Sequence, residues 1–130
     1  MSTRLGILGV AHVHTPSYTH CAQALDGVEV VGVWDVAPGR AETFAQAHGT
    51  QAFADADELL WQVDAAVICA ENVRHRDHAE RAYAHKRHVL CEKPLATTVE
   101  DAEAMVRGAR EAGVMLMTAF PCPFSPSFAA

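Results

Sequence analysis

The sequence has little cysteine, no long apolar segment and no excess of basic residues, and each shortage excludes a class of protein. The 4 cysteines are widely scattered without C-x-x-C spacing, and Cys69 and Cys91 lie in apolar runs, where a free cysteine behaves as a small hydrophobe. No segment approaches the apolar length of a membrane span, and the apolar run near the N-terminus is too short for a signal peptide. We therefore expect a reduced, cytoplasmic protein.

The charge balance is acidic. The formal net charge is −6, from 10 Lys and Arg against 16 Asp and Glu, and no basic stripe offsets it. This argues against a general affinity for nucleic acid, although individual Arg and Lys residues could hold a small anionic ligand. Half of the 130 residues are hydrophobic and 20% are charged, which is the composition of an ordinary globular protein of about one domain.

Strand-like and helix-like hydrophobic periods alternate along the chain, which is typical of βαβ units. Short apolar runs predict buried strands over residues 5–10, 28–34, 65–70, 88–91 and 114–119, with a short extended piece at 51–53. Helices are expected over residues 15–26, 38–48, 57–62, 77–85 and 97–112. Thr15 is the expected N-cap of the first helix, before Pro16. Together they predict an α/β fold, a doubly wound, mostly parallel, Rossmann-like sheet of about six strands.

The turn after the first expected strand is where such a sheet would bind a dinucleotide, because backbone N–H groups and the positive helix end face the pyrophosphate there. The usual fingerprint is G-x-G-x-x-G or G-x-G-x-x-A, and the aligned positions here are Gly9, Ala11 and His14. Only the first glycine is kept. Ala11 adds a methyl group where backbone approaches phosphate, and His14 is bulky where the helix packs on the sheet.

Asp35 strengthens the nucleotide hypothesis. It ends the second expected strand, about 25 residues after Gly9, close to the spacing of the acid that bonds the adenosine ribose. A carboxylate there also repels a 2′-phosphate, which favours NAD over NADP. Arg40 lies nearby and could soften that preference, so NADP stays open as an alternative. The competing interpretation of Asp35 is a solvated turn residue.

The tripeptide Glu92-Lys93-Pro94 follows the apolar run 88–91. Ionisable residues at the carboxyl end of a buried strand lie where α/β sheets bind ligands. Pro94 removes a backbone donor and fixes its own φ, so the chain has to turn there. The alternative is a strand capped by a surface ion pair and a turn.

Several segments together resemble one known family, the glucose-fructose oxidoreductase, inositol dehydrogenase and rhizopine-catabolism (Gfo/Idh/MocA) oxidoreductases. The resemblance is to their N-terminal domain and covers nearly the whole chain. The segment His88-Val89-Leu90-Cys91-Glu92-Lys93-Pro94-Leu95-Ala96 is similar to the family's hallmark almost letter for letter. The other matching segments are residues 5–9, 31–35, 64–72 with His75, and 124–126.

The resemblance implies NAD(P)-dependent oxidation or reduction at a carbon bearing a hydroxyl group, on a sugar, cyclitol or similar polyol. Lys93 corresponds to the family lysine near the nicotinamide and the substrate hydroxyl, where an ammonium can polarise a carbonyl or lower an alcohol's pKa. Glu92 would line the cofactor cleft and Pro94 would shape the turn, with a cis bond as one way to do so. Asn72 and His75 would face the same cleft.

The chain departs from the family in two ways. Ala70-Glu71-Asn72 stands where the family has Thr-Pro-Asn, which puts a carboxylate near the cofactor. The chain also stops where the family's substrate domain begins. We therefore expect a dinucleotide-binding domain over residues 1–120, and in residues 121–130 the start of a connection to a substrate domain. That second domain would hold the polyol, supply an acid/base histidine and form any homo-oligomer, so this part alone is expected to be inactive.

The 8 histidines leave two rival interpretations open. His12-Val13-His14 after a strand is similar to the H-x-H of metal-dependent hydrolase barrels, although such a barrel needs about 250 residues. The second rival is a non-catalytic Rossmann-like module whose nucleotide loop has degraded. We favour a third, in which His12 and His14 replace the small residues of the loop and donate to phosphate or reach substrate. No metal ligand is assigned.

Overall fold

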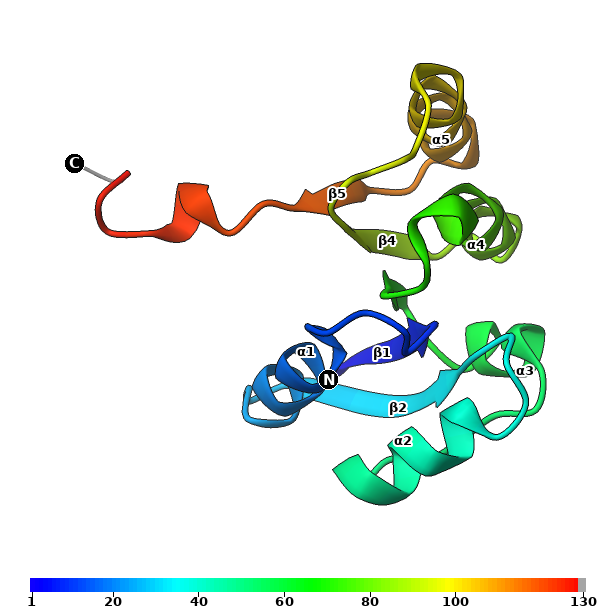
Figure 1. Ribbon diagram of the computed structural model, residues 1–130, viewed down its shortest axis with the longest axis vertical. Helices are drawn as coiled ribbons and strands as arrows, with labels where there is room; N and C mark the ends of the chain where they lie inside the picture. The colour runs from blue at the N-terminus through cyan, green and yellow to red at the C-terminus, as the bar shows by residue number, and fades with distance from the viewer. Residues whose placement is uncertain (129–130) are drawn as a thin grey trace.

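The computed structural model describes residues 1–128, which fold around one parallel sheet (Figure 1). The strands are β1 (Thr3–Leu8), β2 (Val28–Trp34), β3 (Ala65–Ile68), β4 (His88–Glu92) and β5 (Leu116–Ala119). Their order across the sheet is β2-β1-β3-β4-β5, and every neighbouring pair is parallel. All strands therefore end at the same edge of the sheet.

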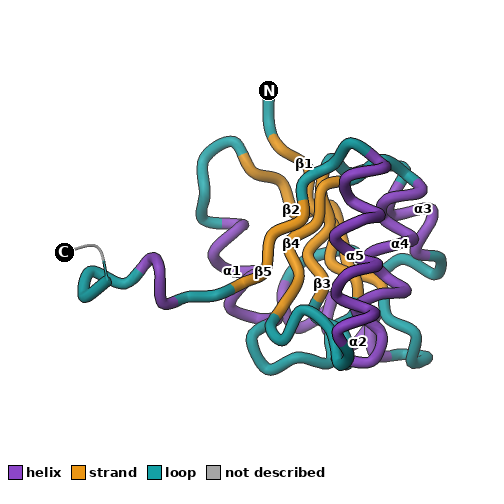
Figure 2. Tube along the Cα trace, turned by 90° about the horizontal axis from the view of Figure 1, so that it is seen from above, coloured by secondary structure: helices purple, strands orange, loops and turns teal. Residues whose placement is uncertain are grey.

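Helices cover both faces of the sheet. They are α1 (Thr15–Gln23), α2 (Arg40–His48), α3 (Ala56–Leu60), α4 (His75–Ala84) and α5 (Val99–Ala112), with two short 3-10 helices, η1 (Asn72–Arg74) and η2 (Cys122–Phe124). Figure 2 shows α1 on one side of the strands and α3, α4 and α5 on the other. None of the helices in the described part of the chain has the length and apolarity needed to cross a membrane.

The core has two halves because successive side chains of each strand point to opposite faces. Ile7 and Val67 belong to the half that packs with α1 and α2, whereas Leu8 and Ile68 belong to the larger half under α3, α4 and α5. Burial of both faces explains why the strands are nearly continuous apolar runs. The predicted doubly wound α/β fold is confirmed.

The sheet has five strands among residues 1–128, where the sequence predicted about six. The extended piece at 51–53 makes only an isolated bridge, between Ala52 and Val33. Phe53 contributes to the core instead, 7% exposed. This piece is too short to form a ladder, because the chain turns from it directly into α3.

Some helix ends differ from the predictions. Thr15 lies inside α1 and His14 is its N-cap, because the Thr15 hydroxyl donates back to the carbonyl of His12 at 2.7 Å. By contrast, the helix expected over residues 97–112 is found as α5 with nearly these bounds. Thr98 is its N-cap and accepts from Asp101 N at 3.1 Å, and Gly113 closes the helix in the left-handed conformation. After β5 the tail extends away from the sheet and contains η2, where no regular element was expected (Figure 1).

Candidate functional site

Four loops gather at the carboxyl edge of the sheet, one after each of β1, β2, β3 and β4. The loops after β1, β2 and β3 surround a switch point, because the chain passes from β1 to β2 on one side and later returns to β3 on the other. Parallel α/β sheets bind ligands in the crevice that such a reversal opens. The sequence-predicted residues lie in or next to these loops.

The loop after β1 is fixed between its neighbours by backbone hydrogen bonds. Gly9 N donates to Trp34 O at 2.7 Å and His12 N donates to Cys69 O at 2.9 Å. Gly9 has φ +81°, and a Cβ placed on it would lie 2.5 Å from Ala70 Cα. This close approach requires glycine, which explains why the first fingerprint glycine is kept.

The same loop presents free backbone donors. Within residues 1–128 the N–H groups of Ala11 and Val13 make no hydrogen bond, and the N-cap His14 makes no side-chain cap to α1. Ala11 and Val13 are exposed. Free N–H groups at an uncapped helix start form a favourable site for an anion such as a pyrophosphate.

Asp35 is buried at the end of β2 and holds the loops together. Its Oδ2 accepts from Val10 N and its Oδ1 from Ala37 N, both at 2.8 Å. Arg40, at the start of α2, places Nη1 3.3 Å from Asp35 Oδ1 and 2.9 Å from Glu71 Oε1. Hydrogen bonding to Glu71 and the charge of Asp35 raise the pKa of Arg40, and Arg40 in turn lowers the pKa of Glu71.

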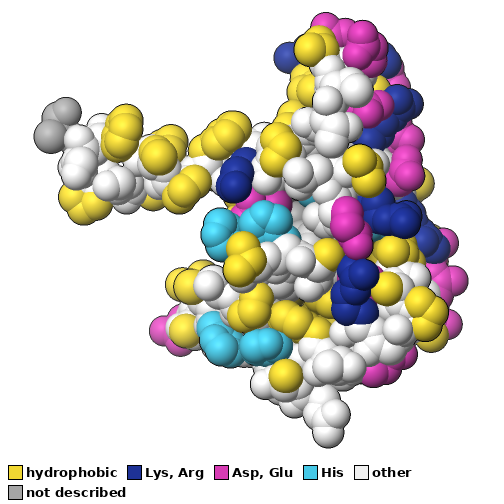
Figure 3. All heavy atoms as spheres, in the orientation of Figure 1, with side chains coloured by type: hydrophobic (Ala, Val, Ile, Leu, Met, Phe, Trp, Pro, Cys, Tyr) yellow, Lys and Arg dark blue, Asp and Glu magenta, His cyan; other side chains and the backbone are white. Residues whose placement is uncertain are grey.

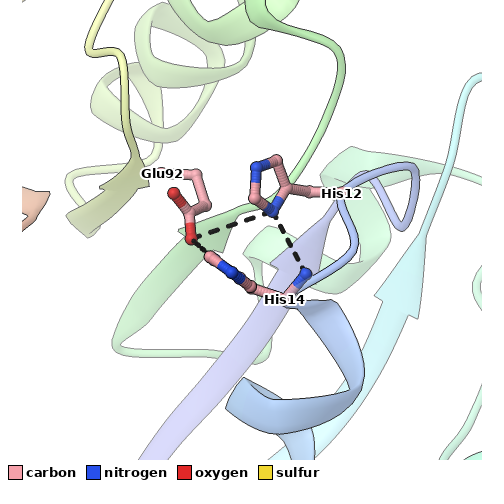
Figure 4. Close-up of side chains that lie close together, drawn as sticks. All are labelled: His12, His14 and Glu92. Atoms are coloured by element: carbon pink, nitrogen blue, oxygen red, sulfur yellow. Dashed lines mark hydrogen bonds and ion pairs between the residues drawn. The ribbon is translucent and has the colours of Figure 1, made fainter. Parts of the chain in front are cut away.

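Glu92 forms the polar centre of the site, at the end of β4 (Figure 4). Its side chain is 1% exposed. Oε1 lies 2.8 Å from His14 Nδ1 and accepts from the Tyr18 hydroxyl at 3.0 Å, while Oε2 accepts from Lys93 N at 2.7 Å. Burial by itself would raise the pKa of Glu92, but these hydrogen bonds outweigh it and the pKa is lowered.

His12, His14 and Glu92 also offer ligand atoms that lie within 4.8 Å of one another. Two imidazoles and a carboxylate are a set that zinc or iron can use. The Nδ1 atoms of both histidines and Oε1 of Glu92 already have protein partners, however. His14 N donates to His12 Nδ1 at 3.2 Å, and His14 Nδ1 lies at 2.8 Å from Glu92 (Figure 4). The cluster is therefore held together by hydrogen bonds within the protein.

Lys93 is exposed beside this network and precedes Pro94 through a cis peptide bond, the form that the turn was expected to allow. No hydrogen bond or ion pair to its ammonium is present among the described residues. Its side chain lines a cavity of about 300 Å³ together with His14, Tyr18 and Glu92. Phe120 and Phe124 of the tail form another part of its wall. In Figure 3 histidine, acidic and basic side chains meet beside the apolar tail.

His75 is placed differently from the expectation that it would face the cleft. It is fully buried at the start of α4, with Nδ1 2.9 Å from Pro94 O and Nε2 3.2 Å from Ala70 O. Its ring thus connects the loop after β3, which contains Ala70, with the loop after β4, which contains Pro94. Asn72 opens η1 and is exposed at the rim of the crevice.

Two contacts of the site were not foreseen. Tyr18 lies one helical turn after His14, a spacing that places both side chains on one side of α1, and this could have indicated its contact with Glu92. The bridge from Arg40 to Glu71 joins residues 31 apart in the sequence, and no local pattern signals it.

The family model described as "Oxidoreductase family, NAD-binding Rossmann fold" matches residues 3–120. The chain belongs to this family. Within this oxidoreductase family, a 1,5-anhydro-D-fructose reductase of Ensifer adhaerens is 36% identical over 118 residues, covering 88% of this chain and 35% of the relative. The NADP(+)-linked scyllo-inositol 2-dehydrogenase IolU of Bacillus subtilis is 32% identical over 128 residues, covering 96% and 39%.

A solved structure agrees with these relatives. A UDP-N-acetylglucosamine 3-dehydrogenase from Acidithiobacillus ferrooxidans superposes with a TM-score of 0.89 at 29% identity, over 99% of this chain and 42% of that one. The chain thus spans well under half the length of the proteins it matches. It is an NAD(P)-binding Rossmann domain of an oxidoreductase family, and the predicted resemblance is confirmed. Neither the metal-hydrolase nor the non-binding interpretation is favoured.

Proposed function

We propose that this domain binds NAD(H) across the carboxyl edge of its sheet and serves as the cofactor half of a dehydrogenase or reductase. The substrate would be a sugar, cyclitol or similar polyol, the class that the relatives' names indicate. The observation that carries the proposal is the convergence of three features on one edge: free backbone donors at Ala11 and Val13, a buried carboxylate at Asp35, and the unpaired ammonium of Lys93.

In this proposal the pyrophosphate lies over residues 9–14, where the free N–H groups of Ala11 and Val13 donate to it and His12 and His14 line the path. Asp35 faces the adenosine ribose, since a carboxylate has acceptor capacity beyond its two backbone bonds. Its charge favours NAD over the 2′-phosphorylated NADP. Asn72 flanks the bound cofactor at the rim of the crevice. His75 positions the loop after β3 through its contact with Ala70 O.

The cofactor, when bound, supplies hydride transfer. The protein's contribution at the reacting end comes from Lys93, whose ammonium can polarise a substrate carbonyl or lower the pKa of a substrate alcohol. Glu92 precedes the lysine in the chain, and the hydrogen bond from Lys93 N to Glu92 Oε2 fixes the backbone from which the lysine side chain projects. Pro94 ends the strand direction after the lysine, whose side chain lines the cavity.

The rest of the proposal concerns what lies outside this domain. We place the cofactor domain at residues 1–120 and the start of a connection in residues 121–130. A second domain would bind the polyol, supply an acid/base residue and carry any homo-oligomer contact, which fits the fraction of its relatives that this chain spans. We further propose a reducing, cytoplasmic setting for the protein, which the 4 free cysteines support.

The deciding experiment is calorimetric titration of this chain with NADH and NADPH, with and without EDTA. Saturable NADH binding that is tighter than NADPH binding and unaffected by EDTA is the expected result. Equal affinity for both would remove Asp35 from its assigned role. Loss of NADH binding in EDTA would assign the histidine and glutamate cluster to a metal instead.

A further inference from the structure

A single arginine connects two loops above the end of β1. Arg40 Nη1 lies 2.9 Å from Glu71 Oε1 and 3.3 Å from Asp35 Oδ1. Asp35 follows β2 and Glu71 follows the end of β3, and these two strands are the neighbours of β1. The contact therefore crosses the carboxyl end of β1, beside the crevice where the adenosine half of a dinucleotide lies in a fold of this type.

Glu71 is held between two guanidinium groups. Its Oε1 accepts from Arg40, and its Oε2 lies 3.7 Å from Arg74 Nε. Oε2 is buried and has no hydrogen-bond partner among the described residues. The side chains of Arg40 and Arg74 are 38% and 46% exposed, so both can reach solvent at the rim. The charges of these two arginines cancel those of Asp35 and Glu71.

We propose that Glu71 is a specificity-determining residue of the cofactor site, which disfavours the 2′-phosphate of NADP by engaging the arginines that would otherwise bind it. Arginine is the usual partner of phosphate groups because its fork of donors matches their oxygens. Here Arg40 already donates to a carboxylate, and a phosphate would have to displace Glu71 while facing Asp35. The uncharged ribose hydroxyls of NAD do not compete for the arginine.

This inference rests on the proposed cofactor function and assigns a specific role to the carboxylate at position 71. Glu71→Gln keeps the size of the side chain and removes its charge, so the four-charge group gains one net positive charge. Arg40 and Arg74 are then free to meet a 2′-phosphate. The effect should be confined to ligands that carry this phosphate.

The test compares two pairs of ligands, NADH with NADPH and AMP with 2′,5′-ADP, because the second pair carries only the adenosine end. In Glu71→Gln we expect the Kd values of NADPH and 2′,5′-ADP to fall about tenfold, with those of NADH and AMP changing less than about threefold. Adding Arg40→Gln should remove most of that gain. Glu80→Gln is the matched control, since Glu80 pairs with Arg76 on α4 at 2.7 Å and is 46% exposed.

Three results would overturn the inference. An unchanged NADPH/NADH affinity ratio in Glu71→Gln, with NADH binding intact, would do so and leave the proposed function standing. A gain that persists in full after Arg40 is removed would show that the bridge is not the determinant. Wild-type protein that binds none of the four ligands would overturn the proposed function and this inference together.

Discussion

At the scale of single residues, the site depends on a carboxylate that is buried but not isolated. Glu92 is 1% exposed and receives hydrogen bonds from the Tyr18 hydroxyl and Lys93 N, with His14 Nδ1 also at 2.8 Å. A buried charge of this kind is stable only while its partners remain. One of these partners is the backbone N–H of Lys93, so the same carboxylate also fixes the backbone from which the lysine projects.

Glu92→Gln should destabilise the domain by about 2 kcal/mol at pH 7, because the charge-assisted hydrogen bonds become weaker ones. The pKa of Glu92 is lowered in the folded protein, so its contribution is present above the pKa of the unfolded chain and is lost as pH falls through the folded value. The difference in unfolding free energy between wild type and Glu92→Gln should therefore become smaller below about pH 4. Urea unfolding of both proteins at pH 7 and at pH 3.5 measures this difference. A difference in unfolding free energy that is larger at pH 3.5 than at pH 7 would contradict this account.

Lys93→Ala in a full-length form should lower turnover by at least about 100-fold, the scale of acid–base catalysis, and leave the fold intact. The reason for an unchanged fold is that its ammonium makes no contact within the described part of the chain. Turnover on a panel of sugars and cyclitols, with circular dichroism as the fold control, provides the measurement. Near-normal turnover would remove Lys93 from its assigned role, and Lys93→Arg separates charge from proton transfer.

Asp35→Ala should weaken NADH binding about tenfold and narrow the difference between NADH and NADPH, because the ribose acceptor and the repelling charge are lost together. The variant also leaves Val10 N and Ala37 N without their acceptor. Asp35→Asn retains one acceptor oxygen and is the control for that structural loss. If the affinity ratio is the same in all three proteins, Asp35 lies outside the cofactor site.

At the scale of elements, the loop after β1 is shaped more by its neighbours than by its own fingerprint. It contacts β2 through Trp34 O and the residue after β3 through Cys69 O, and Gly9 approaches Ala70 too closely for any side chain. Glycines of a G-x-G-x-x-G pattern are usually explained by contacts with the bound nucleotide. Gly9 is instead required by the contact between this loop and Ala70 of the protein. This is why one glycine of the pattern remains although the other two positions are filled.

Gly9→Ala should destabilise the domain by about 2 kcal/mol or more, since both its φ and its packing exclude a Cβ. Gly27→Ala is a matched control, because Gly27 has φ +78° but nothing lies within 4 Å of the Cβ position. The difference in unfolding free energy between the two variants isolates the close approach. Equal losses would mean that left-handed backbone alone explains the effect.

Element boundaries show where sequence reasoning succeeds and where it stops. The extent of α5 could be predicted to within two residues because its ends are set locally, by the side-chain cap of Thr98 and the left-handed conformation of Gly113. The start of α1 could not, because the Thr15 hydroxyl bonds to His12 O in a loop whose path is set by β2 and β3. The piece at 51–53 has the composition of a strand, yet it forms only one bridge with β2. The chain turns into α3 too soon after it for a ladder to form.

At the scale of the whole molecule, the strand ends decide which site residues can be found from sequence. Asp35 and Lys93 directly follow strands and Glu92 is the last residue of one, so a parallel sheet brings all three to one edge whatever the details of packing. Tyr18 and Glu71 take part through side-chain contacts between loops and helices, which only the three-dimensional arrangement reveals. Their roles, like the cofactor-binding roles of the predicted residues, remain proposals that the titrations above would test.

The common direction of the five strands gives the molecule one edge for binding and an opposite edge without these loops. The chain enters β1 at the opposite edge, through Met1 and Ser2, while the tail after β5 runs beside the cavity that Lys93 lines. An affinity tag or a surface attachment at the N-terminus would thus leave the crevice facing solution. The same attachment through the tail would place the support against the wall formed by Phe120 and Phe124.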